Sequence, residues 1–326
     1  MSKRVAAIDC GTNSLRLLIA DVDPARGVLA DVQRRMEIVR LGQGVDATGK
    51  LAPEALERTM KVLAEYAAAI REAGAEAVRM VATSATRDAS NAADFTSGVY
   101  AALGIEPVVI TGAEEARLSF AGATAELAGA VGGPGPLPQP PYLVVDIGGG
   151  STEFVLGPLP PGGNGAATGT DIAGISVDIG CVRLTERHLR SDPPTLAQVR
   201  AASADIDAAL ERVAGAVAVR SANTLVGLAG SVTTVTAIAL GLPEYDSAKT
   251  HHARIPASDV HEVTQRLLSE TREQRAAIPT LHPGRVDVIG AGALVLDRVL
   301  LRFGFADYVT SEHDILDGIA WSIAGG

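Results

Sequence analysis

Two short glycine-rich segments, DCGTNS at 9–14 and DIGGGSTE at 146–153, carry residue types suited to binding phosphate. A tight turn without bulky side chains lets successive backbone amides converge on an anion, and glycine permits both the turn and the close approach. Hydroxyl and amide side chains can add further donors. The residues predicted to bind phosphate in these turns are Gly11, Thr12, Asn13, Ser14, Gly148, Gly149, Gly150 and Ser151.

An aspartate ends the apolar run before each turn, Asp9 in the first segment and Asp146 in the second. A carboxylate does not approach a phosphate directly, because the two negative charges repel each other. A divalent cation or a water must lie between them, and a hard ion such as Mg²⁺ is the usual bridge. Either segment alone is equally compatible with a simple β-turn. Two copies in one chain favour a duplicated phosphate-binding architecture.

The elements that must position these turns alternate between strand and helix. In the first half we expect strands at 5–9, 14–22, 31–39, 77–82 and 107–110 and helices at 53–73, 91–103 and 111–128. In the second half we expect helices at 195–214, 231–240, 258–269 and 286–303. Such alternation favours an α/β fold with a mostly parallel sheet covered by helices. A last helix is expected after Ser311, which forms a capping-box pattern with Asp314, and it is expected to return to the first domain.

Length and composition exclude several classes of protein. A chain of 326 residues with 47% hydrophobic residues is long enough for two packed cores. A net charge of −10 and an aromatic content of 3% argue against a nucleic-acid groove or an anionic membrane surface as partner. The uncharged stretch 225–242 is rich in Gly and Thr, so a buried strand, turn and helix explain it better than a membrane span. Cys10 and Cys181 form no disulfide framework, and a cytoplasmic location is expected.

Further segments narrow the interpretation to one family. The chain resembles the exopolyphosphatase/guanosine pentaphosphate phosphohydrolase (Ppx/GppA) family of the actin/Hsp70/sugar-kinase superfamily through ATSATRDA (82–89), TGAEEARLSFAGA (111–123), DIGGGSTEF (146–154), DIGCVRLTE (178–186), GLAGSVTT (227–234) and SEHDILDGI (311–319). The resemblance implies two actin-like (ribonuclease H-like) domains with a ligand cleft between them. We expect one domain from residues 1–124 plus 304–326 and the other from residues 125–303.

The resemblance also implies roles for individual residues. Glu115 corresponds to the family's proposed base, which activates the attacking water, and Arg87 to an arginine near the bound phosphates. Glu153 matches a second acidic position, and with Asp146 and Asp9 it would hold Mg²⁺. Gly230 and Ser231 fall where the superfamily places the other end of its ligand, at a helix N-terminus that favours anions.

The implied activity is removal of the terminal phosphate from linear inorganic polyphosphate. The alternatives are hydrolysis of guanosine pentaphosphate, which would connect the protein to the stringent response, and a non-catalytic regulator that binds polyphosphate or a nucleotide. A kinase or chaperone ATPase fits the EEA segment less well. We expect short polyphosphate chains as substrates, since the sequence carries no further domain after Gly326. Arg183, Arg187 and Arg190 recur near helical spacing and are compatible either with a short cationic track or with a solvated helix face. The oligomeric state stays open, with a homodimer as one alternative.

Overall fold

The structure, a computed structural model, describes residues 2–125, 127, 137–158 and 172–325. The described residues divide into two compact units. Residues 2–125 and 313–325 form the first unit, and residues 127, 137–158 and 172–312 form the second. The Pro- and Gly-rich segments 132–141 and 157–171, whose composition predicts surface connections, lie largely outside the described residues. Within the described ranges, no helix has the length and apolar character needed to cross a membrane.

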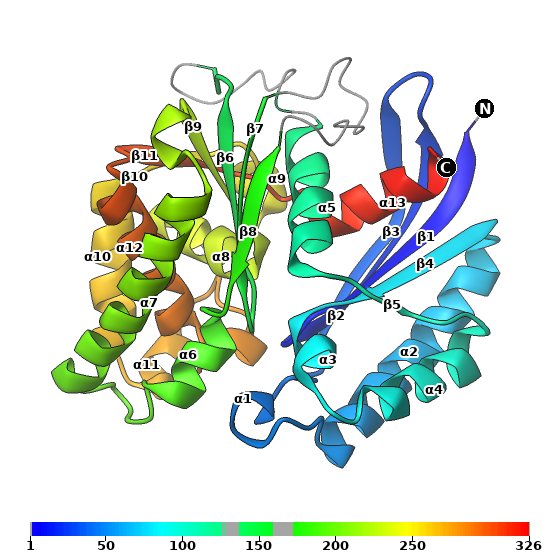
Figure 1. The fold of residues 1–326 in the computed structure, drawn as a ribbon, viewed down its shortest axis with the longest axis horizontal. Helices are drawn as coiled ribbons and strands as arrows, with labels where there is room; N and C mark the ends of the chain where they lie inside the picture. Colours follow the sequence, from blue (N-terminus) through cyan, green and yellow to red (C-terminus); the bar gives the residue numbers. More distant parts are fainter. Residues whose placement is uncertain (1, 126, 128–136, 159–171, 326) are drawn as a thin grey trace. The chain divides into compact units, whose positions relative to one another are not determined.

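The first unit is built on a five-stranded sheet in the order β3-β2-β1-β4-β5 (Figure 1). Its strands are β1 (Lys3–Cys10), β2 (Ser14–Asp23), β3 (Val28–Ile38), β4 (Ala77–Ala82) and β5 (Val108–Val109), and its helices are α1 (Val45–Thr48), α2 (Pro53–Ala73), α3 (Ser84–Asp88), α4 (Ala92–Leu103), α5 (Gly112–Thr124) and α13 (Ile315–Ala324). β1 pairs antiparallel with β2 and parallel with β4. The helix predicted at 53–73 and the strand predicted at 77–82 are confirmed.

Helices cover both faces of this sheet. Alternate side chains of β2 point to opposite faces, and apolar side chains on both faces are buried. Leu15 and Leu17 belong to the core beneath α2 and α4, whereas Leu18 and Val22 belong to the core beneath α13. The helices α2 and α4 lie side by side on their face (Figure 1). The sheet is therefore buried on both sides, which fixes the strand ends that carry the first glycine turn.

The second unit is built on a six-stranded sheet in the order β10-β11-β9-β6-β7-β8. Its strands are β6 (Tyr142–Ile147), β7 (Thr152–Gly157), β8 (Ala173–Val177), β9 (Thr224–Leu228), β10 (Arg254–Pro256) and β11 (Asp307–Thr310), and its helices are α6 (Cys181–Arg187), α7 (Leu196–Ala216), α8 (Ala229–Ala239), α9 (Ser247–Thr250), α10 (Ala257–Ser269), α11 (Arg272–Ala276) and α12 (Ile289–Phe303). The helix α12 packs against α6, α7, α8 and α10 (Figure 1).

The two sheets share one topology. In the first unit an antiparallel meander, β1-β2-β3, is followed by β4 and β5 on the other side of β1. In the second unit the meander β6-β7-β8 is followed by β9 and β11 on the other side of β6, with β10 added at the edge. Both glycine turns join the first two strands of their meander. The predicted α/β fold and its duplication are confirmed. The prediction of a mostly parallel sheet is wrong, because the antiparallel meander at the start of each unit makes both sheets mixed.

The end of the chain differs from the sequence-based expectation in two respects. The strand β11 belongs to the second sheet, so the division between the units falls after Glu312 and not near residue 304. The prediction that Ser311 caps the last helix is wrong. The Ser311 amide donates to the Gly227 carbonyl and extends the sheet contacts, while Asp314 is the N-cap of α13 and forms a capping box with Asp317.

Candidate functional site

In the first glycine turn, the backbone carbonyls accept hydrogen bonds from other parts of the chain. The Gly11 amide donates to the Ser14 carbonyl at 3.0 Å and closes the turn. The Thr12 carbonyl accepts from the Gly42 amide at 2.8 Å. In a trans peptide the N–H points opposite to the C=O, so the Asn13 amide points away from Gly42, and it donates to no acceptor among the described residues. The turn can therefore offer this amide to an anion.

Two contacts from distant segments hold this turn in place. The hydroxyls of Thr12 and Ser84 lie 2.9 Å apart, which joins the turn to the start of α3. A Cβ on Gly42 would lie 2.4 Å from the Thr12 methyl group, so only glycine fits there without a shift. Neither Gly42 nor Ser84 was predicted as a site residue from the sequence. Ser84 lies in the ATSATRDA segment, which is the signal that could have indicated it.

Asp9 lies at the base of the first turn and pairs with Arg16 on the neighbouring strand. Arg16 donates to Asp9 Oδ2 from Nε at 3.0 Å and from Nη2 at 2.8 Å, and a third nitrogen, Nη1, donates to Asp314 Oδ2. Burial raises the pKa of Asp9, and the Arg16 charge opposes that effect. Burial alone would also raise the pKa of Asp314, but Arg16 and Arg34 outweigh it and leave the value lowered.

Glu115 and Arg87 lie together in the first unit. Arg87, in α3, donates from Nη1 to Glu115 Oε2 at 3.2 Å and to the Ile110 carbonyl at 3.1 Å. Glu115 lies in the first turn of α5, where the helix dipole stabilises a carboxylate, and the residue is 8% exposed. Its neighbour Glu114 points elsewhere and accepts from Arg79 at 2.7 Å. The structure thus joins the predicted base and the predicted arginine directly.

The second glycine turn repeats the geometry of the first. The Gly148 amide donates to the Ser151 carbonyl at 3.0 Å, the same closing bond at the same distance. The Gly148 carbonyl accepts from the Cys181 amide at 3.0 Å. In the described part of the chain, the amides of Gly149 and Gly150 donate to no acceptor. Two successive amides are therefore available to an anion.

The helix α6 holds the second turn through the carbonyls. The Gly149 carbonyl accepts from the amides of Val182 and Arg183 at 2.9 and 3.1 Å, and the Gly150 carbonyl accepts from Arg183 Nε at 2.7 Å. A Cβ on Gly180 would lie 2.2 Å from the Gly149 carbonyl oxygen. The DIG segment before α6 therefore requires its glycine. Arg183 supports the turn, a contact that was not predicted from the sequence.

The base of the second turn carries two carboxylates. Asp146 and Glu153 are directly opposite each other in the antiparallel pair of β6 and β7, and both residues are buried. Glu153 Oε1 accepts from the Ser176 hydroxyl at 2.7 Å. Opposed like charges destabilise a strand pair, and a hard cation relieves this repulsion. The two carboxylates are therefore suited to Mg²⁺. The described residues contain no cluster of three or more His, Cys, Asp or Glu side chains arranged for a metal.

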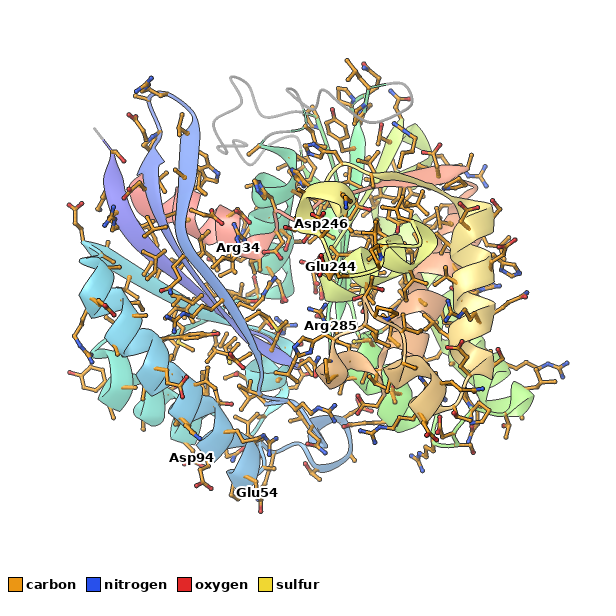
Figure 2. All side chains as sticks on the ribbon, turned by 180° about the vertical axis from the view of Figure 1, so that it is seen from behind. Arg34, Glu54, Asp94, Glu244, Asp246 and Arg285 are labelled. Atoms are coloured by element: carbon orange, nitrogen blue, oxygen red, sulfur yellow. The ribbon has the colours of Figure 1, made fainter. Side chains whose placement is uncertain are left out.

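Gly230 and Ser231 follow β9, whose last residue, Leu228, pairs with Asp146, so the start of α8 lies at the same sheet edge as the second turn. The guanidinium of Arg285 covers this helix start: a Cβ on Gly230 would lie 2.3 Å from it, and Nη1 donates to the Thr234 hydroxyl at 3.3 Å. Figure 2 labels Arg285, which is the last residue of the short 3-10 turn Pro283–Arg285 that His282 caps. Arg285 was not predicted as a site residue from the sequence.

The predicted site residues therefore gather at one sheet edge in each unit. The first unit holds Asp9, Gly11, Thr12, Asn13, Ser14, Arg87 and Glu115, and the second holds Asp146, Gly148, Gly149, Gly150, Ser151, Glu153, Gly230 and Ser231. Both cysteines are buried and free, Cys10 within the first core and Cys181 beneath the second turn.

Comparisons with known proteins agree with this arrangement. The model of the Ppx/GppA phosphatase family matches residues 18–324. Exopolyphosphatase 2 of Mycobacterium tuberculosis is 52% identical over 333 residues, which covers 99% of both chains. The crystal structure of an exopolyphosphatase-like protein superimposes with a TM-score of 0.90 at 42% identity and covers 99% of both chains. A Ppx/GppA family member from Aquifex aeolicus superimposes with a TM-score of 0.77 at 30% identity, covering 99% of this chain and 98% of that one.

Proposed function

The chain belongs to the Ppx/GppA phosphatase family, and we propose that it is an exopolyphosphatase that removes the terminal phosphate from linear inorganic polyphosphate. The observation that carries this proposal is the duplicated turn, in which the carbonyls are bound by the protein and the amides of Asn13, Gly149 and Gly150 are available to phosphate oxygens. The 52% identity to an exopolyphosphatase supports polyphosphate as the substrate.

In the proposed reaction, a water oxygen attacks the terminal phosphorus and the bond between that phosphorus and the bridging oxygen breaks. Glu115 orients the water and accepts its proton. Arg87 donates to oxygens of the group being transferred and stabilises their developing charge. The products are orthophosphate and a chain that is one unit shorter.

Asp146 and Glu153 are the residues that would hold Mg²⁺, with Asp9 as a further carboxylate. When bound, this ion neutralises charge on the phosphate oxygens. The turn amides hold the phosphates, and Ser231 and Gly230 add a second position at the N-terminus of α8. The proposal of Mg²⁺ is based on these two carboxylates, which lie opposite each other on β6 and β7.

Short chains are the proposed substrates because the expected cationic track is largely committed to other contacts. Arg187 donates to Asp205 at 2.7 Å, Arg183 donates to the Gly150 carbonyl, and Arg190 donates to the Glu186 carbonyl at 3.0 Å. A long polyanion would need several cations whose donor groups are not already held in contacts within the protein. We also propose a cytoplasmic location, since both cysteines are free thiols, as expected in a reducing compartment.

The test is a phosphate-release assay with Mg²⁺ on polyphosphates of increasing length, guanosine pentaphosphate and ATP. We expect the highest kcat/KM on short polyphosphate and little release from ATP. A rate that rises steadily toward very long chains would contradict the length preference. Faster hydrolysis of guanosine pentaphosphate would favour that alternative, and binding of polyphosphate without release would favour a regulator.

A further inference from the structure

Arg16 forms hydrogen bonds to only one of the two carboxylate oxygens of Asp9. Both Nε and Nη2 of Arg16 donate to Asp9 Oδ2, at 3.0 and 2.8 Å. The other oxygen, Oδ1, is buried and has no hydrogen-bond partner among the described residues. A guanidinium more commonly forms one bond to each oxygen of a carboxylate, so this pair departs from the usual geometry.

The same strand pair provides an internal comparison. Arg4 and Asp21 also lie opposite each other on β1 and β2. There, Arg4 Nε donates to Asp21 Oδ1 and Nη2 donates to Oδ2, both at 2.8 Å. Arg4 thus occupies both oxygens of its partner. The difference at Arg16 is its third bond, from Nη1 to Asp314.

Asp314 is well placed to determine the position of the Arg16 guanidinium. Its Oδ1 accepts from the Leu316 amide at 3.0 Å and starts α13, while its Oδ2 faces Arg16. Its backbone is held closely against α5: a Cβ on Gly122 would lie 1.8 Å from the Asp314 carbonyl oxygen, and one on Gly318 would lie 2.1 Å from the Leu118 carbonyl oxygen. The helix that carries Glu115 therefore fixes Asp314.

We propose that Asp314 is a positioning residue, which holds the Arg16 guanidinium so that Asp9 keeps Oδ1 available to the phosphate-bound cation or to its water. This inference rests on the proposed function. Without the Asp314 carboxylate, Arg16 is released to form one bond to each oxygen of Asp9, as Arg4 does with Asp21. Asp9 would then lose the oxygen that it offers to the ligand.

Asp314→Asn and Asp317→Asn form a matched pair of variants. Both substitutions keep the side-chain volume and remove one buried carboxylate charge from the same capping box. Asp317 pairs with Arg34, which Figure 2 labels on β3, through a bond of 2.6 Å from Nη2. Both variants should therefore melt at lower temperature than wild type, but only Asp314→Asn removes the third bond of Arg16.

Two readouts separate positioning from a purely structural role. For Asp314→Asn we expect the Mg²⁺ concentration for half-maximal phosphate release to rise about tenfold, as for other residues that orient a metal ligand. We also expect a smaller rise in melting temperature on adding Mg²⁺ without substrate. Asp317→Asn should match wild type in both readouts. If Asp314→Asn does not fold, Asp314→Ser, which keeps a capping oxygen, carries the same expectation.

Equal responses of Asp314→Asn and Asp317→Asn in both readouts would overturn the inference while leaving the proposed function intact. A wild-type protein that releases no phosphate from polyphosphate would instead overturn the proposed function. The double variant Arg16→Lys/Asp314→Asn adds a third criterion. Its effect on the Mg²⁺ requirement should be no larger than that of Arg16→Lys alone, because both changes break one chain of contacts. Additive effects would contradict the proposal.

Discussion

Glu153 lies directly opposite Asp146 across the β6–β7 pair. The corresponding position in the first unit, seven residues after Asp9, is Arg16, which lies opposite Asp9 across the β1–β2 pair. The two turns share their closing hydrogen bond and their topology, but the residue opposite the aspartate differs. It is an arginine in the first turn and a second carboxylate in the second. The second turn is therefore the better suited of the two to hold a divalent cation.

Glu153→Gln should raise the melting temperature without Mg²⁺ and weaken the response of the activity to Mg²⁺. Without Mg²⁺ we expect the variant to melt at higher temperature than wild type, because a neutral amide relieves the repulsion between opposed carboxylates. With Mg²⁺ the half-saturating concentration for phosphate release should rise by at least about tenfold. Thermal denaturation with and without Mg²⁺ measures the first effect, and a Mg²⁺ titration of the activity measures the second.

Ser176→Ala is the matched control for this prediction. It removes only the hydroxyl that donates to Glu153 Oε1 and leaves both carboxylates in place, so its effect on the Mg²⁺ requirement should be smaller. A Glu153→Gln variant with the wild-type requirement for Mg²⁺ would show that the opposed pair does not hold the ion.

Glu115→Gln should abolish most phosphate release while leaving substrate binding intact. The amide oxygen can still accept from Arg87, so the local structure is retained, but the side chain no longer accepts a proton from water. Loss of a general base lowers kcat by about 100- to 10,000-fold. Single-turnover phosphate release and equilibrium binding of a short polyphosphate measure the two properties separately.

Glu114→Gln is the control for the base assignment. Glu114 lies beside Glu115 in α5 but pairs with Arg79, so we expect kcat close to wild type. If Glu114→Gln lost as much activity as Glu115→Gln, the base would be misassigned or the effect would come from the helix as a whole.

Gly180→Ala should destabilise the second turn. The added methyl group would lie 2.2 Å from the Gly149 carbonyl oxygen, so backbone must move, at a cost of about 2 kcal/mol in the free energy of unfolding. Phosphate release should fall as well, because Gly149 and Gly150 would shift. Gly215→Ala is the control: it lies in α7 with no atom within 4 Å of the added Cβ, and should stabilise the protein by up to about 1 kcal/mol. Urea denaturation compares the two, and equal stabilities would contradict the argument.

The sequence predicted the parts of the site that depend on local geometry. A glycine turn after an apolar strand can be predicted because the turn, the strand end and the acid are neighbours in the chain. The structure shows the same closing hydrogen bond in both copies of the turn. Gly42, Ser84 and Arg285 were not predicted. Each lies tens of residues from the group that it contacts, and the contact exists only after the sheet has formed.

The end of the chain illustrates a different limit. Ser311 and Asp314 show the same capping pattern as Asp314 and Asp317, so the sequence alone offers two starts for the last helix. The choice is made by β11, because the sheet takes the Ser311 amide as a donor to Gly227. The same sheet contact moves the division between the units to a position after Glu312.

The last prediction concerns the pH dependence of stability at Asp205 in α7. Its carboxylate accepts from Arg187 at 2.7 Å and lies 2.9 Å from His188 Nε2. Burial acts to raise the pKa of Asp205, but these two partners outweigh it, so the value is lowered in the folded state. A lowered pKa means that the carboxylate stabilises the fold above its unfolded pKa of about 3.9 and that this contribution is lost as the pH falls through the folded value.

Asp205→Asn should therefore be less stable than wild type by about 1 kcal/mol near neutral pH, the upper range for a partly exposed ion pair. The difference should shrink below about pH 4 and vanish once the wild-type carboxyl is protonated. Urea denaturation of both proteins across this range provides the measurement. A difference that stayed constant into acid would indicate that Asp205 acts through packing and not through its charge. In the Arg187→Ala background, Asp205→Asn should cost less than in wild type, because one of the partners that lowers the pKa is already gone.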